Sequence, residues 1–172
     1  MILSGPEIRA GIDRGDIVVE PYHQRCIEPN SYGIHLGNTI LTYKDTVLDI
    51  HHPLDTVTYK IPDQGFILQP DQFYLAATKE RIGSTVFAAE LYATCSAATS
   101  GIFIQLSAPL GHCGAIVNWT LEIVVAHSII VYPGMPIGKV CFWKNEGQLQ
   151  TYLGRYEGDR SVTSSRVILD AR

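Results

Sequence analysis

Residues 101–123 read GIFIQLSAPLGHCGAIVNWTLEI, and they lie in a longer segment, residues 91–138, whose only formal charge is Glu122. Apolar and β-branched residues dominate this segment, which is typical of strands. A carboxylate without a partner is costly to bury among such residues, and burial of a carboxylate raises its pKa. We therefore interpret Glu122 as the first candidate for a group that transfers protons.

Working outward from this segment, short apolar runs separated by turn residues continue in both directions. Near the N-terminus, Ser4-Gly5-Pro6-Glu7 has the pattern of a capping box, and Ile8 and Ile12 share one apolar face before Gly15. The sequence predicts an all-β sandwich or barrel that follows one short helix. The predicted strands are residues 17–19, 31–36, 40–43, 57–61, 66–68, 73–77, 86–94, 102–107, 119–125, 129–131 and 137–143.

The scarcity of charge across residues 91–138 also bears on assembly. Antiparallel strands with one face in water normally alternate apolar and polar residues, whereas these strands have little charge on either face. We expect both faces to be covered, most simply by neighbouring copies of the chain, and therefore expect an obligate oligomer.

The chain has 172 residues and a net charge of -4. This length predicts one folded domain, residues 1–150, and a polar tail, residues 151–172, that is either a frayed terminus or a segment that closes over a site. There is no basic stripe, which argues against nucleic acid as a partner, and no apolar run long enough for a membrane span. The N-terminus lacks the pattern of a secretory signal, so we expect a cytoplasmic protein.

The four cysteines, Cys26, Cys95, Cys113 and Cys141, show no CxxC spacing. Their apolar surroundings predict buried free thiols rather than disulfides or a zinc site. The HxE and PCxxC elements of zinc-dependent deaminases are missing from the sequence. Any deamination by this chain is therefore expected to proceed without a metal.

Several motifs, in the correct order, resemble those of one family. Residues 101–123 match, without a gap, G-L-x-V-H-x-T-A-P-x-x-H/D-P-G-W/F-x-G-x-x-x-L-E-F/I. Residues 27–38, IEPNSYGIHLGN, are similar to I-x-P-x-S-Y-D-L-R-L-G-N, and residues 132–138, YPGMPIG, to a PGM-x-I strand. Tyr152, Arg155-Tyr156 and Ser165-Arg166 follow the tail pattern Y…G-K-Y-x-G-Q…S-R. Over nearly its whole length the chain resembles the metal-independent dCTP deaminases of the dUTPase-like superfamily.

This resemblance implies a distorted β-barrel or jelly roll, assembled as a homotrimer with active sites between neighbouring chains. It implies that Glu122 is the general base that activates water for attack on C4 of cytosine. The backbone at Ser107 and Ala108 would contact the pyrimidine edge, and His112 the sugar. Tyr152, Arg155 and the rest of the tail would cover the phosphates. No cofactor is implied for deamination, although magnesium could accompany the nucleotide phosphates.

The chain departs from the family at an element with the pattern G-R-S-S-x-x-R, which here reads ATCSAAT over residues 93–99. Thr94 and Thr99 replace the two phosphate-binding arginines, and Cys95 replaces the first serine, whereas Ser96 is retained. Losing two charge-assisted hydrogen bonds weakens triphosphate binding by roughly a hundredfold or more. Gln105 stands in place of a histidine, and Asp159 in place of a glutamine, where it would repel a polyphosphate.

These observations leave three functions open. The first is hydrolytic deamination of a cytosine nucleotide or nucleoside, with Glu122, Ser96 and Cys95 at the reacting centre, where Cys95 packs or positions water. The second is a noncatalytic trimer that binds a nucleotide or a protein. The third, a magnesium-dependent diphosphohydrolase, needs an aspartate that the central segment lacks. For Glu122 the structural alternative is an ion pair or a hydrogen-bonded acid, and for His112 an ordinary loop residue.

Overall fold

The computed structural model describes residues 1–169, and its first element is the predicted short helix, α1 (Gly5–Arg14). Ser4 is the N-cap residue, and Pro6 lies in the first turn, where its fixed φ favours helix. Gly15 ends the helix in the left-handed conformation, with φ of 81°. The capping box is wrong in one respect, because the Ser4 side chain makes no capping hydrogen bond. Its backbone carbonyl instead accepts the Ile8 N–H at 2.9 Å.

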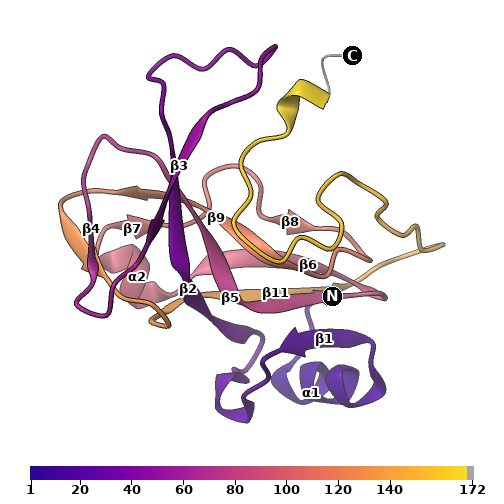
Figure 1. The fold of residues 1–172 in the computed structure, drawn as a ribbon. Helices are drawn as coiled ribbons and strands as arrows, with labels where there is room; N and C mark the ends of the chain where they lie inside the picture. Colours follow the sequence, from indigo (N-terminus) through magenta and orange to yellow (C-terminus); the bar gives the residue numbers. More distant parts are fainter. Residues whose placement is uncertain (170–172) are drawn as a thin grey trace.

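The remaining chain is mostly β, as predicted, and forms a curled half-barrel sheet (Figure 1). Its strands pair antiparallel in the order β7-β9-β5-β2-β11-β6-β8, with β1 added to β5 and β3 to β2, while β10 and β4 form a separate pair. The strands are β1 (Ile17–Glu20), β2 (Tyr32–Tyr43), β3 (Thr56–Lys60), β4 (Phe66–Leu68), β5 (Tyr74–Ser84), β6 (Phe87–Ala93), β7 (Ile102–Phe103), β8 (Leu110–Gly111), β9 (Val117–Val125), β10 (Ile129–Val131) and β11 (Pro136–Lys144).

Over the described residues the fold has three short helical elements besides α1. The 3-10 turn η1 (Gln24–Cys26) precedes β2, the short helix α2 (Cys95–Thr99) follows β6, and the 3-10 turn η2 (Val167–Leu169) is in the tail. The predicted strands at 31–36 and 40–43 are one strand, β2, with an irregular register between Leu36 and Ile40. The predicted strand at 102–107 ends at residue 103, and neither α2 nor β8 was predicted.

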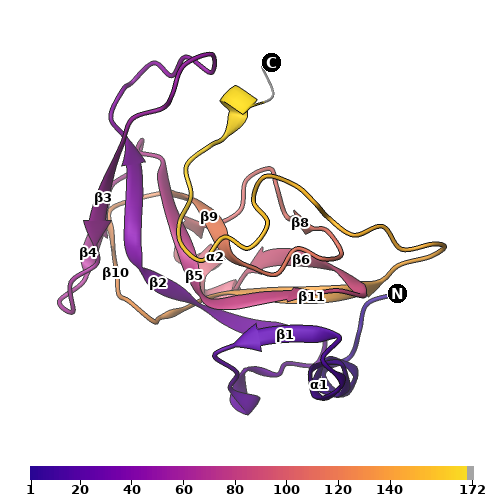
Figure 2. The ribbon, with the colours of Figure 1, turned by 45° about the vertical axis from the view of Figure 1, so that its right-hand side comes forward.

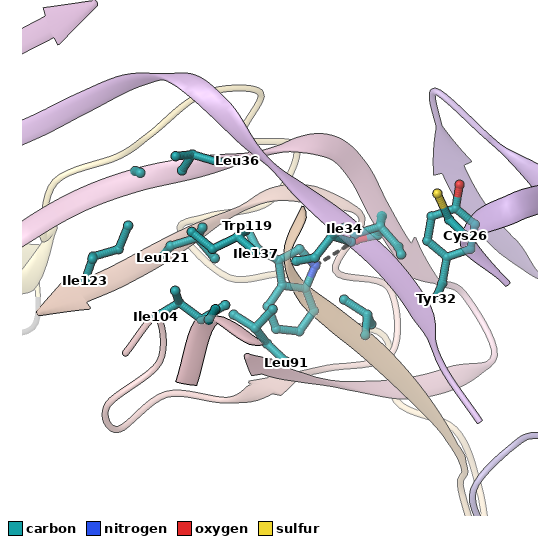
Figure 3. Close-up of a cluster of buried hydrophobic side chains, with 14 of the residues drawn as sticks. Cys26, Tyr32, Ile34, Leu36, Leu91, Ile104, Trp119, Leu121, Ile123 and Ile137 are labelled. Atoms are coloured by element: carbon teal, nitrogen blue, oxygen red, sulfur yellow. Dashed lines mark hydrogen bonds between the residues drawn. The ribbon is translucent and has the colours of Figure 1, made fainter. Parts of the chain in front are cut away.

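The core lies inside the curl of the sheet (Figure 3). In β9, Trp119, Leu121, Ile123 and Val125 are buried there, and the residues between them face the other side of the strand. The Trp119 indole N–H donates to the Ile82 carbonyl at 3.0 Å, so its polar atom is satisfied within the core. This alternation places Glu122 on the opposite face of β9 from the core.

The β5 residue Glu80 is a deeply buried carboxylate that the sequence did not predict. Glu80 is only 1% exposed and accepts the backbone N–H of His35 at 2.8 Å, while its other oxygen lies 2.6 Å from His35 Nδ1. The pairing of β5 with β9 shifts register between Ala77 and Arg81, and this shift accommodates the charged residues 79–81 within the strand. The neighbouring strand compensates, because the Asn118 side-chain amide donates to the Thr78 carbonyl at 3.0 Å.

All four cysteines are free thiols, as predicted, and Cys26, Cys113 and Cys141 are buried. Cys95 is exposed, which corrects the prediction of a buried thiol, because it lies at the surface end of α2. Across residues 1–169, no helix has the length and apolarity that a membrane crossing requires.

Candidate functional site

A cavity of about 550 Å³ lies between β9, the segment from β7 to β9 that contains β8, and the C-terminal tail, residues 151–169. Figure 2 shows the path of this tail past β8 and β9. Its volume falls in the range of small-molecule sites. Of the predicted site residues, it brings together Glu122, Ala108, His112, Tyr152 and Asp159. The other lining residues are Tyr43, Phe73, Leu75, Leu110, Gly111, Ala115, Val117, Asn118, Trp119, Thr120, Tyr156, Thr163, Ser164 and Ser165.

Glu122 is half-buried on the cavity face of β9. Its Oε2 accepts the backbone N–H groups of Leu106 and Ser107, each at 3.1 Å, and its own N–H donates to the Ile104 carbonyl at 3.0 Å. Donors aimed at a carboxylate form charge-assisted hydrogen bonds, which are stronger than neutral ones. The side chain is therefore held in one place by the loop. The Ser107 amide, which the resemblance directs towards the pyrimidine, is engaged by Glu122.

A tight turn presents His112 at the rim of the cavity. Gly114 adopts a φ of 94°, which favours glycine, and its N–H donates to the Ser84 carbonyl at 2.7 Å. The Cys113 thiol donates to the Thr85 carbonyl, and burial raises the pKa of this thiol. His112 itself is exposed, and its ring stacks on Tyr152 with centroids 5.5 Å apart and planes 16° from parallel.

The tail packs against this turn and against β9. The Tyr152 N–H donates to the Cys113 carbonyl at 2.8 Å, and the Asn118 N–H donates to the Asp159 carbonyl at 3.0 Å. Farther along, the Ser165 N–H donates to the Tyr43 hydroxyl at 3.0 Å. These bonds give the cavity its outer wall. The face of β9 that carries Glu122 is therefore partly covered by the tail of the same chain, whereas the sequence predicted cover by neighbouring copies.

The predicted residues on α2 lie elsewhere. Thr94 caps α2 by accepting the Ala97 N–H at 3.1 Å, and Thr99 donates its hydroxyl to the Cys95 carbonyl at 2.8 Å. Both hydroxyls are therefore used within the helix. Cys95 and Ser96 are exposed, and neither lines the cavity that contains Glu122.

Three further predicted residues also stand outside the cavity lining. Gln105 is half-buried, Ser107 is exposed, and the Arg155 guanidinium donates to the Arg166 carbonyl at 2.9 Å. Over the described part of the chain, residues 1–169, His, Cys, Asp and Glu side chains form no group of three or more that could hold a metal ion.

Comparison with known proteins identifies the family of this chain. The family model described as "dCTP deaminase-like" matches residues 2–145. The chain belongs to this family. The resemblance predicted from the motifs is thereby confirmed.

Curated proteins named dCTP deaminase are similar to the chain over almost its whole length. It is 34% identical over 171 residues to the "dCTP deaminase, dUMP-forming" of Clostridium beijerinckii, which covers 99% of this chain and 98% of the relative. The protein of the same name from Cytophaga hutchinsonii is also 34% identical over 171 residues, with the same coverage.

The fold agrees with a solved dCTP deaminase structure. The 2'-deoxycytidine 5'-triphosphate deaminase of Agrobacterium tumefaciens superposes with a TM-score of 0.64 at 18% identity, over 84% of this chain. The chain spans about half, 48%, of that structure's length. At this identity the superposition supports the all-β fold of the dCTP deaminase-like chain, not its activity.

Sequence reasoning missed several residues that line the cavity, among them Trp119, Thr120 and Thr163. Thr120 could have been found, because it is two residues from Glu122 on the same strand and must share its face. Thr163 gave no signal in the sequence, since the path of the tail depends on long-range contacts such as its N–H bond to the Thr120 hydroxyl at 3.4 Å.

Proposed function

We propose that this protein is a hydrolytic deaminase of a cytosine nucleotide or nucleoside, with Glu122 as the general base. The observation that carries the proposal is the position of Glu122, which lines a cavity of ligand size while two backbone N–H groups fix its carboxylate. The names of the curated relatives, which are dCTP deaminases, support cytosine as the base that is deaminated.

The reaction needs one group that takes a proton and later returns it. Glu122 accepts a proton from water as the water oxygen bonds to C4 of cytosine. The C4–N bond then breaks, and the proton held by the carboxyl group passes to the departing amino nitrogen, which leaves as ammonia. This transfer restores the carboxylate, and the proton of the hydroxyl group on C4 moves to N3 to give the uracil product. Water is the only other reactant.

We also propose that the protein is a homotrimer in which each site lies between two chains. Exposed apolar side chains surround the loop that holds Glu122: Phe103 is 47% exposed, Leu106 48% and Leu110 57%. Clusters of this kind mark interaction surfaces. A neighbouring copy seated there could bring Cys95 and Ser96 of its α2 to the cavity. In this arrangement Ser96 positions the water molecule.

The tail and the loop contribute to substrate binding in this proposal. His112, on which Tyr152 is stacked, would contact the sugar, and Gln105 and Ala108 would lie near the base. Tyr152 and Arg155 would cover any phosphates that the substrate carries. Deamination requires no cofactor, and magnesium would enter only as a companion of nucleotide phosphates.

The proposal is tested by incubating the purified protein with cytosine, cytidine and deoxycytidine compounds from the nucleoside to the triphosphate, with and without EDTA, and measuring ammonia. Ammonia release that is unaffected by EDTA supports the proposal. Turnover abolished by EDTA contradicts it in favour of a metal-dependent phosphohydrolase. Binding without any ammonia release contradicts it in favour of a noncatalytic protein. Because the relatives are named dUMP-forming, product analysis should also include released diphosphate.

A further inference from the structure

The cavity that contains Glu122 has the wrong charge for a polyphosphate. Among its lining residues, all within the described part of the chain, are two carboxylates, Glu122 and Asp159, and no lysine or arginine. The rest of the lining is aromatic, apolar or neutral. A triphosphate brought into this space would face the Glu122 carboxylate, and the lining itself supplies no cation to bind the phosphates.

One cation of the tail, Arg166, is already neutralised by a residue of the cavity lining. Arg166 lies 3.0 Å from the Asp159 carboxylate, and its guanidinium is 5.1 Å from the centre of the Tyr156 ring. The Asp159 carboxylate also accepts the Thr163 hydroxyl at 2.9 Å. Arg155 donates to the Arg166 carbonyl, so the two arginines are bonded to the tail itself. Asp159 thus holds in an internal ion pair a cation that would otherwise serve a phosphate.

A neighbouring copy of the chain cannot supply the missing charge through the same segment. Residues 91–138, which include α2, β7, β8 and β9, contain no lysine or arginine. Whatever part of this segment a second copy presents to the cavity, it brings no cation.

Two cations do lie nearby, but in a different hollow. Lys79 and Arg160 line a second cavity of about 460 Å³, which shares only Asn118 with the first. At that residue the backbone N–H of β9 donates to the Asp159 carbonyl at 3.0 Å. The tail therefore crosses β9 between the two cavities. A phosphate chain could reach Lys79 only if this part of the tail detached.

We infer that the preferred substrate is an uncharged cytosine nucleoside rather than a nucleoside triphosphate. This inference rests on the proposed deaminase function. The cavity retains a proton-transfer group and neutral donors for a base and a sugar, while the groups that would bind phosphate are replaced or paired.

The first test compares deoxycytidine, dCMP and dCTP as substrates and as ligands. We expect kcat/KM to be at least about tenfold higher for deoxycytidine than for dCTP, since each phosphate adds repulsion from Glu122 and meets no lysine or arginine in the lining. Isothermal titration with the Glu122→Gln variant gives the binding order without turnover. If no compound is deaminated but deoxycytidine binds more tightly than dCTP, the deaminase proposal fails and the inference about charge stands. If dCTP is the better substrate or the tighter ligand, the inference is overturned.

The second test removes the internal ion pair. Asp159→Asn releases Arg166, so the ratio of kcat/KM for dCTP to kcat/KM for deoxycytidine should rise at least about tenfold. Asp63→Asn is the matched control, because it removes the same charge from an exposed turn outside the cavity lining. Equal effects of the two substitutions, or no rise in this ratio with Asp159→Asn, would overturn the role assigned to Asp159.

Discussion

Replacing Glu122 with glutamine tests the role of this residue with the smallest possible change in shape. The glutamine oxygen can still accept the Leu106 and Ser107 N–H groups that now donate at 3.1 Å. The two bonds change from charge-assisted to neutral, which costs about 1 kcal/mol each. Because Leu106 and Ser107 are exposed and water can replace a weakened bond, we expect the free energy of unfolding to fall by no more than about 2 kcal/mol.

The effect on turnover should be far larger than the effect on folding. An amide cannot accept the proton of the attacking water, and general-base catalysis contributes about 10²–10⁴-fold to a rate. We therefore expect kcat of Glu122→Gln to fall by at least about a hundredfold. The dissociation constant for deoxycytidine should change only a few fold, since the cavity keeps its shape.

The assay measures ammonia release, the dissociation constant by isothermal titration and the free energy of unfolding by urea denaturation. Glu146→Gln, which removes a charge at an exposed position, is the control and should behave as the wild type. Wild-type turnover by Glu122→Gln would refute the assignment of a general base. A loss of folding well beyond 2 kcal/mol would instead indicate that Glu122 is mainly structural.

Three other changes have defined outcomes. Trp119→Phe removes the buried indole N–H bond to a β5 carbonyl and should cost about 2–3 kcal/mol in urea unfolding; a loss under about 0.5 kcal/mol would contradict this. Glu80→Ala removes both bonds to His35 and should lower the free energy of unfolding in urea by about 3 kcal/mol, clearly more than Glu80→Gln. Equal losses for the two variants would contradict this. Hydrogen bonding to Glu90, with some burial, raises the pKa of Tyr92 to about 12 from 10.0. The stability from this shift is present below pH 10 and lost towards pH 12, so the Tm advantage of the wild type over Tyr92→Phe should shrink across that range, and a constant difference would contradict the shift.

The strands were predictable where one face is in the core and the other is not. In β9, Trp119, Leu121 and Ile123 alternate with polar residues, and this period of two is a local signal. The start and end of α1 were equally local, because Pro6 and Gly15 restrict the backbone there. Such features need no knowledge of the rest of the fold.

The stretch Lys79-Glu80-Arg81 shows why other parts escaped prediction. The predicted strand ended at residue 77, before these three consecutive charged residues, whereas β5 continues to residue 84. The strand can continue because His35, which is 45 positions away in sequence, provides the partner that Glu80 needs. A pairing over that distance leaves no pattern in the local sequence.

The same limit applies to the cavity. The single charge within residues 91–138 drew attention to Glu122, which lines the cavity, whereas Glu80 is the more deeply buried acid. The role of Glu122 as a general base stays a prediction. The positions of Cys95, Ser96, Thr94 and Thr99 on a separate helix could not be foreseen, because the motif that contains them gives their order and not their distance from Glu122. Their role in the site stays a prediction.

The alternation along β9 gives the protein a property that is useful for engineering. Odd-numbered positions such as Leu121 and Ile123 maintain the hydrophobic interior, whereas Thr120 and Glu122 face the cavity. Altering the size or polarity of residue 120 should therefore retune ligand selectivity without weakening the scaffold. Directed mutagenesis at residue 120, with the odd-numbered sites left unchanged, would search for new specificities in a library of mostly folded variants.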